Sequence, residues 1–239
     1  MVRIKEKRQE QKDKKTYMKI LQIQDEHVKD FFDMDGCGLE IEFGVVYEAR
    51  CRVYIETGLK KLKAFVGNRG KFVLDDSIGK FLNVEIVLNP FLPEELEPIF
   101  KGILDILNFY DNFVVDENCG VHANFRADDE IKERFYDLLS DGRYDSDRFS
   151  HSKYKADFNE TIRNENGSTK SFQDYLKYQQ IVGAKYCGVN FLKDNLLEVR
   201  TLNLSWDDVM YFYEIYEAAK VLVPGEVSSI TGNFSLIAL

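Results

Sequence analysis

The segment at 39–43, Leu-Glu-Ile-Glu-Phe, alternates apolar and acidic residues with a period of two. Successive side chains of an extended strand point to opposite faces, so this alternation predicts a strand with one apolar and one acidic face. Similar alternation follows at 84–88, 120–126 and 196–203. The chain is therefore expected to fold around a sheet whose apolar face packs on a core and whose other face is polar.

The direction of the strands follows from the length of their connections. The strands predicted at 186–191 and 196–203 are joined by a turn at 193–195, which is too short for a crossover between parallel strands. A further strand is expected at 71–74. Apolar residues at helical spacing predict helices at 17–32, 47–66, 93–110, 129–139, 171–181 and 205–223. This order predicts an α+β fold, with a mostly antiparallel sheet and helices packed on one face.

Composition limits the class of protein. Of the 239 residues 44% are hydrophobic, and the 31 Phe and Tyr residues exclude a disordered chain. No stretch approaches 18 apolar residues, and the first residues lack the apolar middle of a signal peptide, so an intracellular, cytoplasmic protein without a membrane span is expected. None of the cysteines forms a C-x-x-C pair, and free thiols are predicted for Cys37, Cys51, Cys119 and Cys187.

Charge is distributed unevenly along the chain. The net charge of −9 argues against bulk binding of nucleic acid, but residues 1–15 carry +4. This basic segment is interpreted as a solvated helix or a frayed end, and contact with RNA or a membrane surface is the alternative.

Three parts of the chain are expected. They are a basic extension with a helix at 1–35, a main domain at 36–223 and a tail at 224–239. Only six of the thirty residues at 141–170 are hydrophobic, and this segment is too long for an ordinary connection. It is predicted to be either a lid or an insertion with little function.

Four of the predicted strands direct unusual side chains to the polar face. An ordinary solvated sheet face mixes Lys, Thr, Ser and Glu, whereas this one holds four carboxylates and an imidazole, with no Lys at these positions. The residues expected together are Glu40, Glu42, Glu85, His122, Asn124, Glu198 and Arg200.

Carboxylates held close together repel one another unless a cation bridges them or one takes up a proton. Oxygen ligands with one imidazole suit Mg²⁺ or Mn²⁺, and a guanidinium such as that of Arg200 would bind phosphate beside the metal. The residues alone thus favour a metal and nucleotide site. The alternative is that these are four unrelated exposed strand faces.

Six short motifs occur in an order that resembles a known family. They are Gly-Leu-Glu-Ile-Glu-Phe at 38–43, Asp-Asp-Ser at 75–77, Val-Glu-Ile-Val-Leu-Asn-Pro at 84–90, Cys-Gly-Val-His-Ala-Asn at 119–124, Lys-Tyr-Cys-Gly-Val-Asn at 185–190 and Leu-Glu-Val-Arg at 197–200. The set resembles the amidoligase family of the carboxylate–amine ligase superfamily, which includes glutamine synthetase and glutamate–cysteine ligase. The resemblance covers roughly residues 36–223.

The resemblance implies a sheet like that of the glutamine synthetase catalytic domain, whose open concave face binds ATP and divalent metal ions. ATP would phosphorylate a substrate carboxylate, and an amine would attack the acyl phosphate to give an amide. Matched to the motifs, the metal ligands would be Glu40, Glu42, Glu85, His122 and Glu198. Glu198 and Arg200 would act in catalysis. Asn124, Arg126 and Arg200 are expected at the nucleotide.

One position departs from the family pattern, because Asn124 stands where a second His is usual. An Asn can coordinate a metal or hydrogen-bond a substrate, but it cannot shuttle a proton. Two alternatives to a ligase therefore stay open: an inactive member that serves as a binding or assembly module, and a metal-dependent phosphatase or nuclease. The substrates would be a carboxylate and an amine, the latter from an amino acid, polyamine, peptide or cell-wall precursor.

Overall fold

A computed structural model describes residues 2–23, 36–75, 80–115, 119–141, 161–184, 187–202 and 205–221. The expected tail at 224–239, most of the polar segment at 141–170 and the second half of the helix expected at 17–32 lie outside these ranges.

The centre of the fold is a sheet of seven strands in which every paired neighbour is antiparallel. The strand order is β2-β3-β1-β5-β7-β6, and β4 pairs with β1. The strands are β1 (Cys37–Val45), β2 (Gly70–Leu74), β3 (Leu82–Leu88), β4 (Phe113–Val114), β5 (Val121–Arg126), β6 (Val189–Asn190) and β7 (Leu196–Leu202). The α+β class and the antiparallel sheet predicted from the sequence are confirmed.

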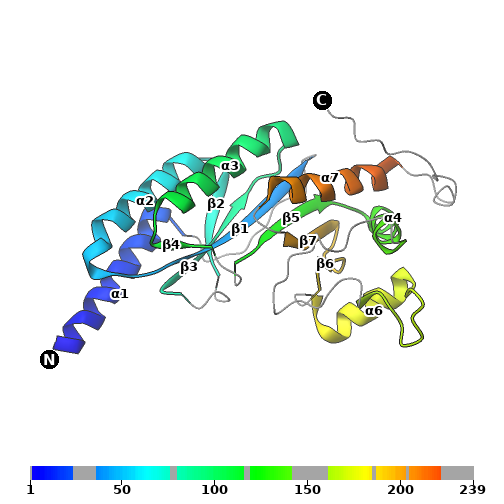
Figure 1. Cartoon of the computed structure of the whole chain (residues 1–239), viewed down its shortest axis with the longest axis horizontal. Coiled ribbons are helices and arrows are strands. Elements are labelled where there is room, and N and C mark those ends of the chain that lie inside the picture. Colours follow the sequence, from blue (N-terminus) through cyan, green and yellow to red (C-terminus); the bar gives the residue numbers. More distant parts are fainter. Residues whose placement is uncertain are drawn as a thin grey trace.

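Helices α2, α3 and α7 lie along one side of the sheet, with α1 against α2 and with α4 and α6 beyond the β6 edge (Figure 1). The helices are α1 (Val2–Leu21), α2 (Arg52–Val66), α3 (Pro93–Phe109), α4 (Asp129–Ser140), α6 (Phe172–Val182) and α7 (Trp206–Val221), and a 3₁₀ turn at Ala49–Cys51 precedes α2. In the described part of the chain, no helix combines the length and the apolar character that crossing a membrane requires.

The core lies between the sheet and these helices. The inward residues of β1 are fully buried: Leu39, Ile41 and Phe43. They belong to one continuous apolar cluster with α2, α3 and α7. The ring of Phe125 on β5 stacks on that of Tyr216 on α7, with centroids 4.8 Å apart. Because the apolar side chains of each strand pack against the helices, the polar side chains of the same strand must lie on the opposite face of the sheet.

A second group of packed rings fixes the β6 edge. Tyr136 of α4 and Tyr175 of α6 lie 5.1 Å apart between centroids. Phe172 of α6 lies 5.4 Å from Phe191, which directly follows β6. The side chain of Gln179 completes this anchor, because its amide donates to the carbonyl of Val189 and its oxygen accepts from the Phe191 N–H at 3.1 Å.

Some element boundaries differ from those expected. The first helix begins at Val2, because the basic segment consists largely of Lys, Arg, Gln and Glu, which favour helix. It ends at Leu21, and Gln22 adopts a positive φ of 55°. The strand expected at 186–191 is reduced to Val189–Asn190, while the two-residue β4 was not predicted.

The carboxylate of Asp13 ties α1 to the rest of the fold. It is fully buried, accepts a hydrogen bond from the Tyr47 hydroxyl at 2.8 Å and another from Gln9 at 2.8 Å, and lies 3.2 Å from the Arg52 guanidinium of α2. Tyr17 and Leu21, on the same side of α1, are buried in the main core. The described part of the N-terminal helix is therefore packed onto α2 and the main core.

Asp13→Ala is expected to lower the free energy of unfolding by about 2–3 kcal/mol, because two partly buried hydrogen bonds to a charged group are lost. Denaturant unfolding measures this. Glu97→Ala, which removes an exposed ion pair with Lys101, is the control and should change stability little. Equal stability of Asp13→Ala and the parent protein would contradict this account of how α1 is held.

Candidate functional site

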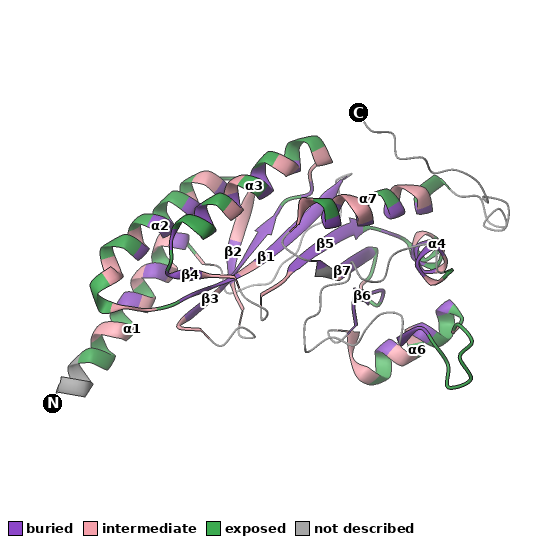
Figure 2. Ribbon diagram, in the orientation of Figure 1, coloured by how far each residue is buried: buried purple, intermediate pink, exposed green. Residues whose placement is uncertain are grey.

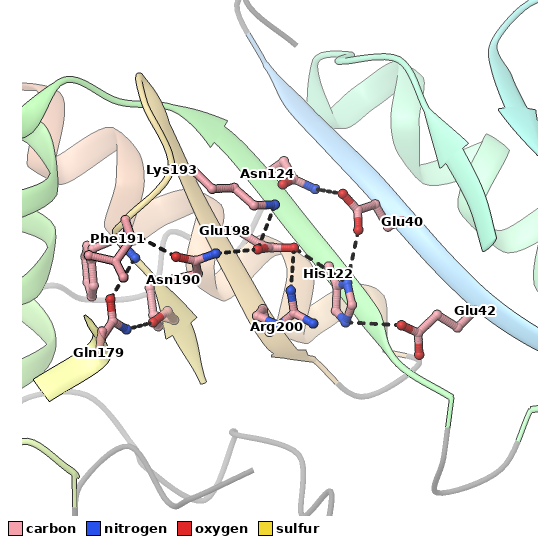
Figure 3. A network of polar contacts seen from close by, with 12 residues as sticks. Glu40, Glu42, His122, Asn124, Gln179, Asn190, Phe191, Lys193, Glu198 and Arg200 are labelled. Carbon is pink, nitrogen blue, oxygen red and sulfur yellow. Dashed lines mark hydrogen bonds and ion pairs between the residues drawn. The ribbon is translucent and has the colours of Figure 1, made fainter. Parts of the chain in front are cut away.

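The register of the strands brings the polar side chains of the sheet together. Glu40 pairs with His122 across β1 and β5, and Glu42 pairs with Glu85 across β1 and β3. Glu198 on β7 stands between Asn124 on β5 and Asn190 on β6. Because partners in an antiparallel pair point to the same side, all of these side chains share the face away from α2, α3 and α7. Figure 3 shows those of Glu40, Glu42, His122, Asn124, Asn190 and Glu198.

His122 is the centre of the cluster. Its Nδ1 lies 3.1 Å from Oε2 of Glu40 and 3.8 Å from Oε1 of Glu198, and its Nε2 lies 3.5 Å from Oε1 of Glu42. Both ring nitrogens therefore face carboxylates. A neutral imidazole carries one N–H, so one nitrogen directs its lone pair at a carboxylate unless a second proton or a metal ion offsets the repulsion.

Three of these residues meet the spacing of a metal site. One ligand atom from each of Glu40, Glu85 and His122 lies within 4.8 Å of the other two, and all three residues are buried. Bonds of about 2.1 Å to a small divalent cation place opposite ligands about 4.2 Å apart, so this group needs only a slight contraction to enclose one. Two carboxylates and an imidazole suit Mn²⁺ or Mg²⁺.

The side chain of Asn124 gives a second indication that a cation or a ligand binds here. Its amide donates to Oε1 of Glu40 at 3.0 Å, which turns its carbonyl oxygen away from that carboxylate. Asn124 is only 2% exposed, and its Oδ1 has no hydrogen-bond partner among the residues that the structure describes. A buried amide oxygen without a donor costs on the order of 1–3 kcal/mol, which a bound cation or a donor on a ligand would recover. The residues present thus fit a metal ion.

Gly120 allows the close approach of Glu42 to His122. Its backbone N–H donates to Oε2 of Glu42 at 2.7 Å, and its carbonyl accepts from the Glu42 N–H at 3.0 Å. A Cβ at this position would lie 3.3 Å from Nε2 of His122 and 3.5 Å from Oε2 of Glu42. The glycine of the Cys-Gly-Val-His motif therefore provides space and a backbone donor for the acidic group.

Glu198 has a different environment, because cations surround it. Oε1 accepts from Nη1 of Arg200 at 3.0 Å, and Oε2 lies 2.7 Å from Nζ of Lys193. The amide of Asn190 donates to Oε2 at 3.0 Å. Complete burial opposes ionisation of Glu198, but the charges of Arg200, His122 and Lys193 outweigh it and lower its pKa to about 2.

Arg200 is stabilised in turn by this carboxylate. Burial favours its neutral form, yet the charge and the hydrogen bond of Glu198 raise the pKa of the guanidinium above its ordinary value. Glu40 and Glu42 add to this effect. Arg200 is thus a fixed positive charge beside the acidic cluster.

The polar face is more buried than the open face expected from the sequence. The sheet does not close on itself, because β2 and β6 are its edge strands. Its acidic side chains are nevertheless at most 5% exposed at Glu40, Glu85 and Glu198. Figure 2 shows the central strands as buried along most of their length. The polar side chains pack on one another, and a small apolar group on the same face flanks them, consisting of Val73, Val87 and Leu196.

Most of the residues expected at the site lie in this cluster: Glu40, Glu42, Glu85, His122, Asn124, Glu198 and Arg200. Arg126 follows Asn124 on the same strand, but its side chain is exposed at the strand end, and no ion pair among the described residues joins it to the cluster.

Two residues of the cluster were missed. Asn190 was expected only as part of a motif, although a turn centred on residue 194 places it opposite Glu198 and could have identified it. Lys193 was assigned to a turn, and no pattern in the sequence indicated that its side chain folds back onto Glu198.

Comparison with models of known protein families gives no match for this chain, and comparisons with curated proteins and with solved structures give none either. The resemblance to the amidoligase family therefore rests on the motifs, and the case for a site rests on the geometry described above.

Glu85→Gln should remove the response of the protein to Mn²⁺ without destabilising it. In the parent protein, Mn²⁺ at about 100 times its dissociation constant should add about 2.7 kcal/mol of stability. The variant should show little of this gain, while its metal-free form should be as stable as the parent or more so, because one of several like charges is gone. Thermal unfolding with and without Mn²⁺ measures both.

Glu97→Gln on the exposed side of α3 is the matched control and should respond to Mn²⁺ as the parent does. A Glu85→Gln protein that keeps the full Mn²⁺ response would exclude this group of residues as the metal site.

The low pKa of Glu198 predicts a specific dependence of stability on pH. A carboxyl whose folded pKa is about 2 stabilises the fold above its ordinary pKa of 4.5, and this contribution is lost as pH falls from about 4.5 towards 2. Metal-free Glu198→Gln should therefore be less stable than the parent at pH 6, and the difference should shrink towards pH 2.5. A difference that is constant over this range would show that Glu198 is not held as a carboxylate.

Proposed function

We propose that this protein is an ATP-dependent carboxylate–amine ligase, which joins an amine to a carboxylate through an acyl phosphate and releases ADP and phosphate. The sequence motifs motivate the reaction class. The observation that carries it is the juxtaposition, on one sheet face, of a compact acidic group around His122 with the fixed positive charge of Arg200. Transfer of a phosphoryl group needs both kinds of charge, since it requires a metal site and positive groups for the phosphate oxygens.

The acidic half of the face would hold the metal. Glu40, Glu85 and His122 supply the ligand atoms, with Glu42 beside them, and Asn124 orients Glu40 through its amide. A bound Mg²⁺ or Mn²⁺ would neutralise phosphate charge during the transfer. Asn124, held on one side by Glu40, presents its buried oxygen to the same space and could accept a hydrogen bond from the amine or from the nucleotide.

The basic half would stabilise the transferred group. Arg200 is held by Glu198, is always charged and remains partly accessible, with 21% of its side chain exposed. Because burial excludes much of the water, its charge acts on phosphate oxygens at a lower effective dielectric constant than in solution. No side-chain nucleophile is needed, because ATP supplies the activation of the carboxylate. The four cysteines are free thiols, which suits the expected cytoplasmic location.

Incubation with ATP, Mg²⁺ and a panel of carboxylates and amines tests the proposal, with ADP and amide product measured together. The parent protein is expected to release ADP only when both substrates are present. Glu40→Gln should lower the rate at least 100-fold while keeping the fold, because it removes a metal ligand and the partner of His122 and Asn124.

Phosphate release without an amide product would favour the phosphatase or nuclease alternative. Failure to bind Mn²⁺ or a nucleotide at all would favour the inactive binding module. Glu97→Gln should leave the rate unchanged and serves as the control for the loss of an acidic group.

A further inference from the structure

Lys193 lies in the turn between β6 and β7, and its ammonium reaches back over the polar face. Its Nζ is 2.7 Å from Oε2 of Glu198 (Figure 3). An ordinary turn lysine extends into solvent, whereas this side chain is only 29% exposed. The turn therefore places a second cation beside Arg200, at a position that the sequence motifs did not indicate.

The backbone of this turn is held by contacts from three sides. Oδ1 of Asn190 accepts a hydrogen bond from the Leu192 N–H at 3.0 Å, and Nζ of Lys132 donates to the carbonyl of Lys193 at 2.6 Å. Lys132 on α4 is 4% exposed, so a buried ammonium is directed at one main-chain oxygen of the turn. Gln179 fixes the strand just before the turn. The position of Lys193 is thus set by the fold.

Two cations, Arg200 and Lys193, share the single carboxylate of Glu198 at this end of the face. The charges of Glu40 and Glu42 act on Arg200 as well, whereas Lys193 forms its ion pair with Glu198. The other end, around Glu40 and Glu42, carries an excess of negative charge. An ammonium has three donors and Glu198 takes one of them, so Lys193 can bind a further anion without leaving Glu198.

We propose that Lys193 is a phosphate-binding residue of this site, acting beside Arg200 on the nucleotide. The inference rests on the proposed function, because a nucleotide phosphate is the anion that would reach both the metal group and the cationic end. Lys193 binds through charge and hydrogen bonds, and Glu198 and the carbonyl contact from Lys132 hold it over the face.

Binding of a non-hydrolysable ATP analogue at saturating Mg²⁺, measured by calorimetry, tests the role of Lys193. Lys193→Met keeps the length of the side chain and removes its charge, and it should weaken nucleotide binding on the order of tenfold or more. Lys193→Arg should keep most of the affinity. Lys177→Met, which removes a lysine paired with Asp174 on the outer side of α6, is the matched control and should bind as the parent does.

Mn²⁺ binding in the absence of nucleotide shows whether Lys193→Met removes only a phosphate contact or disrupts the whole site. Lys193→Met should bind Mn²⁺ as tightly as the parent or more tightly, because it removes a positive charge near the metal group, whereas Glu40→Gln should bind it at least tenfold more weakly. Unchanged nucleotide affinity in Lys193→Met, or an Mn²⁺ defect as large as that of Glu40→Gln, would overturn the role of Lys193.

The two proposals can fail separately. If the parent forms amides and Lys193→Met binds nucleotide normally, the inference about Lys193 is wrong and the ligase stands. If nucleotide binding depends on Lys193 but no amide forms with any substrate pair, the inference stands and the ligase proposal is wrong.

Discussion

The packing of several carboxylates around one imidazole is the interaction on which this structure depends. Carboxylate oxygens of Glu40, Glu42 and Glu198 all lie within 4 Å of a ring nitrogen of His122. Glu40 and Glu198 are almost fully buried. Buried carboxylates are costly unless charge and hydrogen bonds compensate for lost solvation. The fold supplies part of this compensation through strand register, since Glu40 is paired with His122 and Glu198 stands between Asn124 and Asn190. Glu42 accepts from the Gly120 N–H.

The groups that compensate the buried carboxylates differ between the two ends of the polar face. At the β7 end, burial opposes the ionisation of Glu198, but the charges of Arg200, His122 and Lys193 outweigh it and lower the pKa to about 2. The amide of Asn190 donates a hydrogen bond to the same carboxylate. At the β1 end, Nδ1 of His122 contacts Glu40, the amide of Asn124 donates to it, and Glu85 lies close by. Among the described residues, Oδ1 of Asn124 has no hydrogen-bond donor. The β7 end therefore presents two cations held on one carboxylate, and the β1 end presents ligand atoms at the spacing of a cation site. This asymmetry matches what a metal-bound phosphate group requires.

The sequence predicted much of this arrangement, because alternation with period two determines which side chains share a face. It placed Glu40 with Glu42 and Glu198 with Arg200, and the short turn before β7 required antiparallel pairing. It could not give the relative register of β1, β3 and β5, which depends on how the whole sheet packs against α2, α3 and α7. Lys193 was missed because no sequence pattern fixes the direction of a side chain in a turn, and the turn is held by a contact from Lys132 on α4 to the Lys193 carbonyl. Arg126, which was expected at the nucleotide, is exposed at the end of β5, beyond the last residue of the cluster on that strand.

Diffraction from crystals soaked in Mn²⁺, recorded where manganese scatters anomalously, tests the central claim most directly. The account predicts an anomalous peak within bonding distance, about 2.2 Å, of carboxylate oxygens of Glu40 and Glu85 and of a ring nitrogen of His122. Its second prediction is that Glu198 keeps its contacts with Arg200 and Lys193. Well-ordered crystals with no manganese among Glu40, Glu85 and His122, and with His122 contacting only carboxylates, would contradict it.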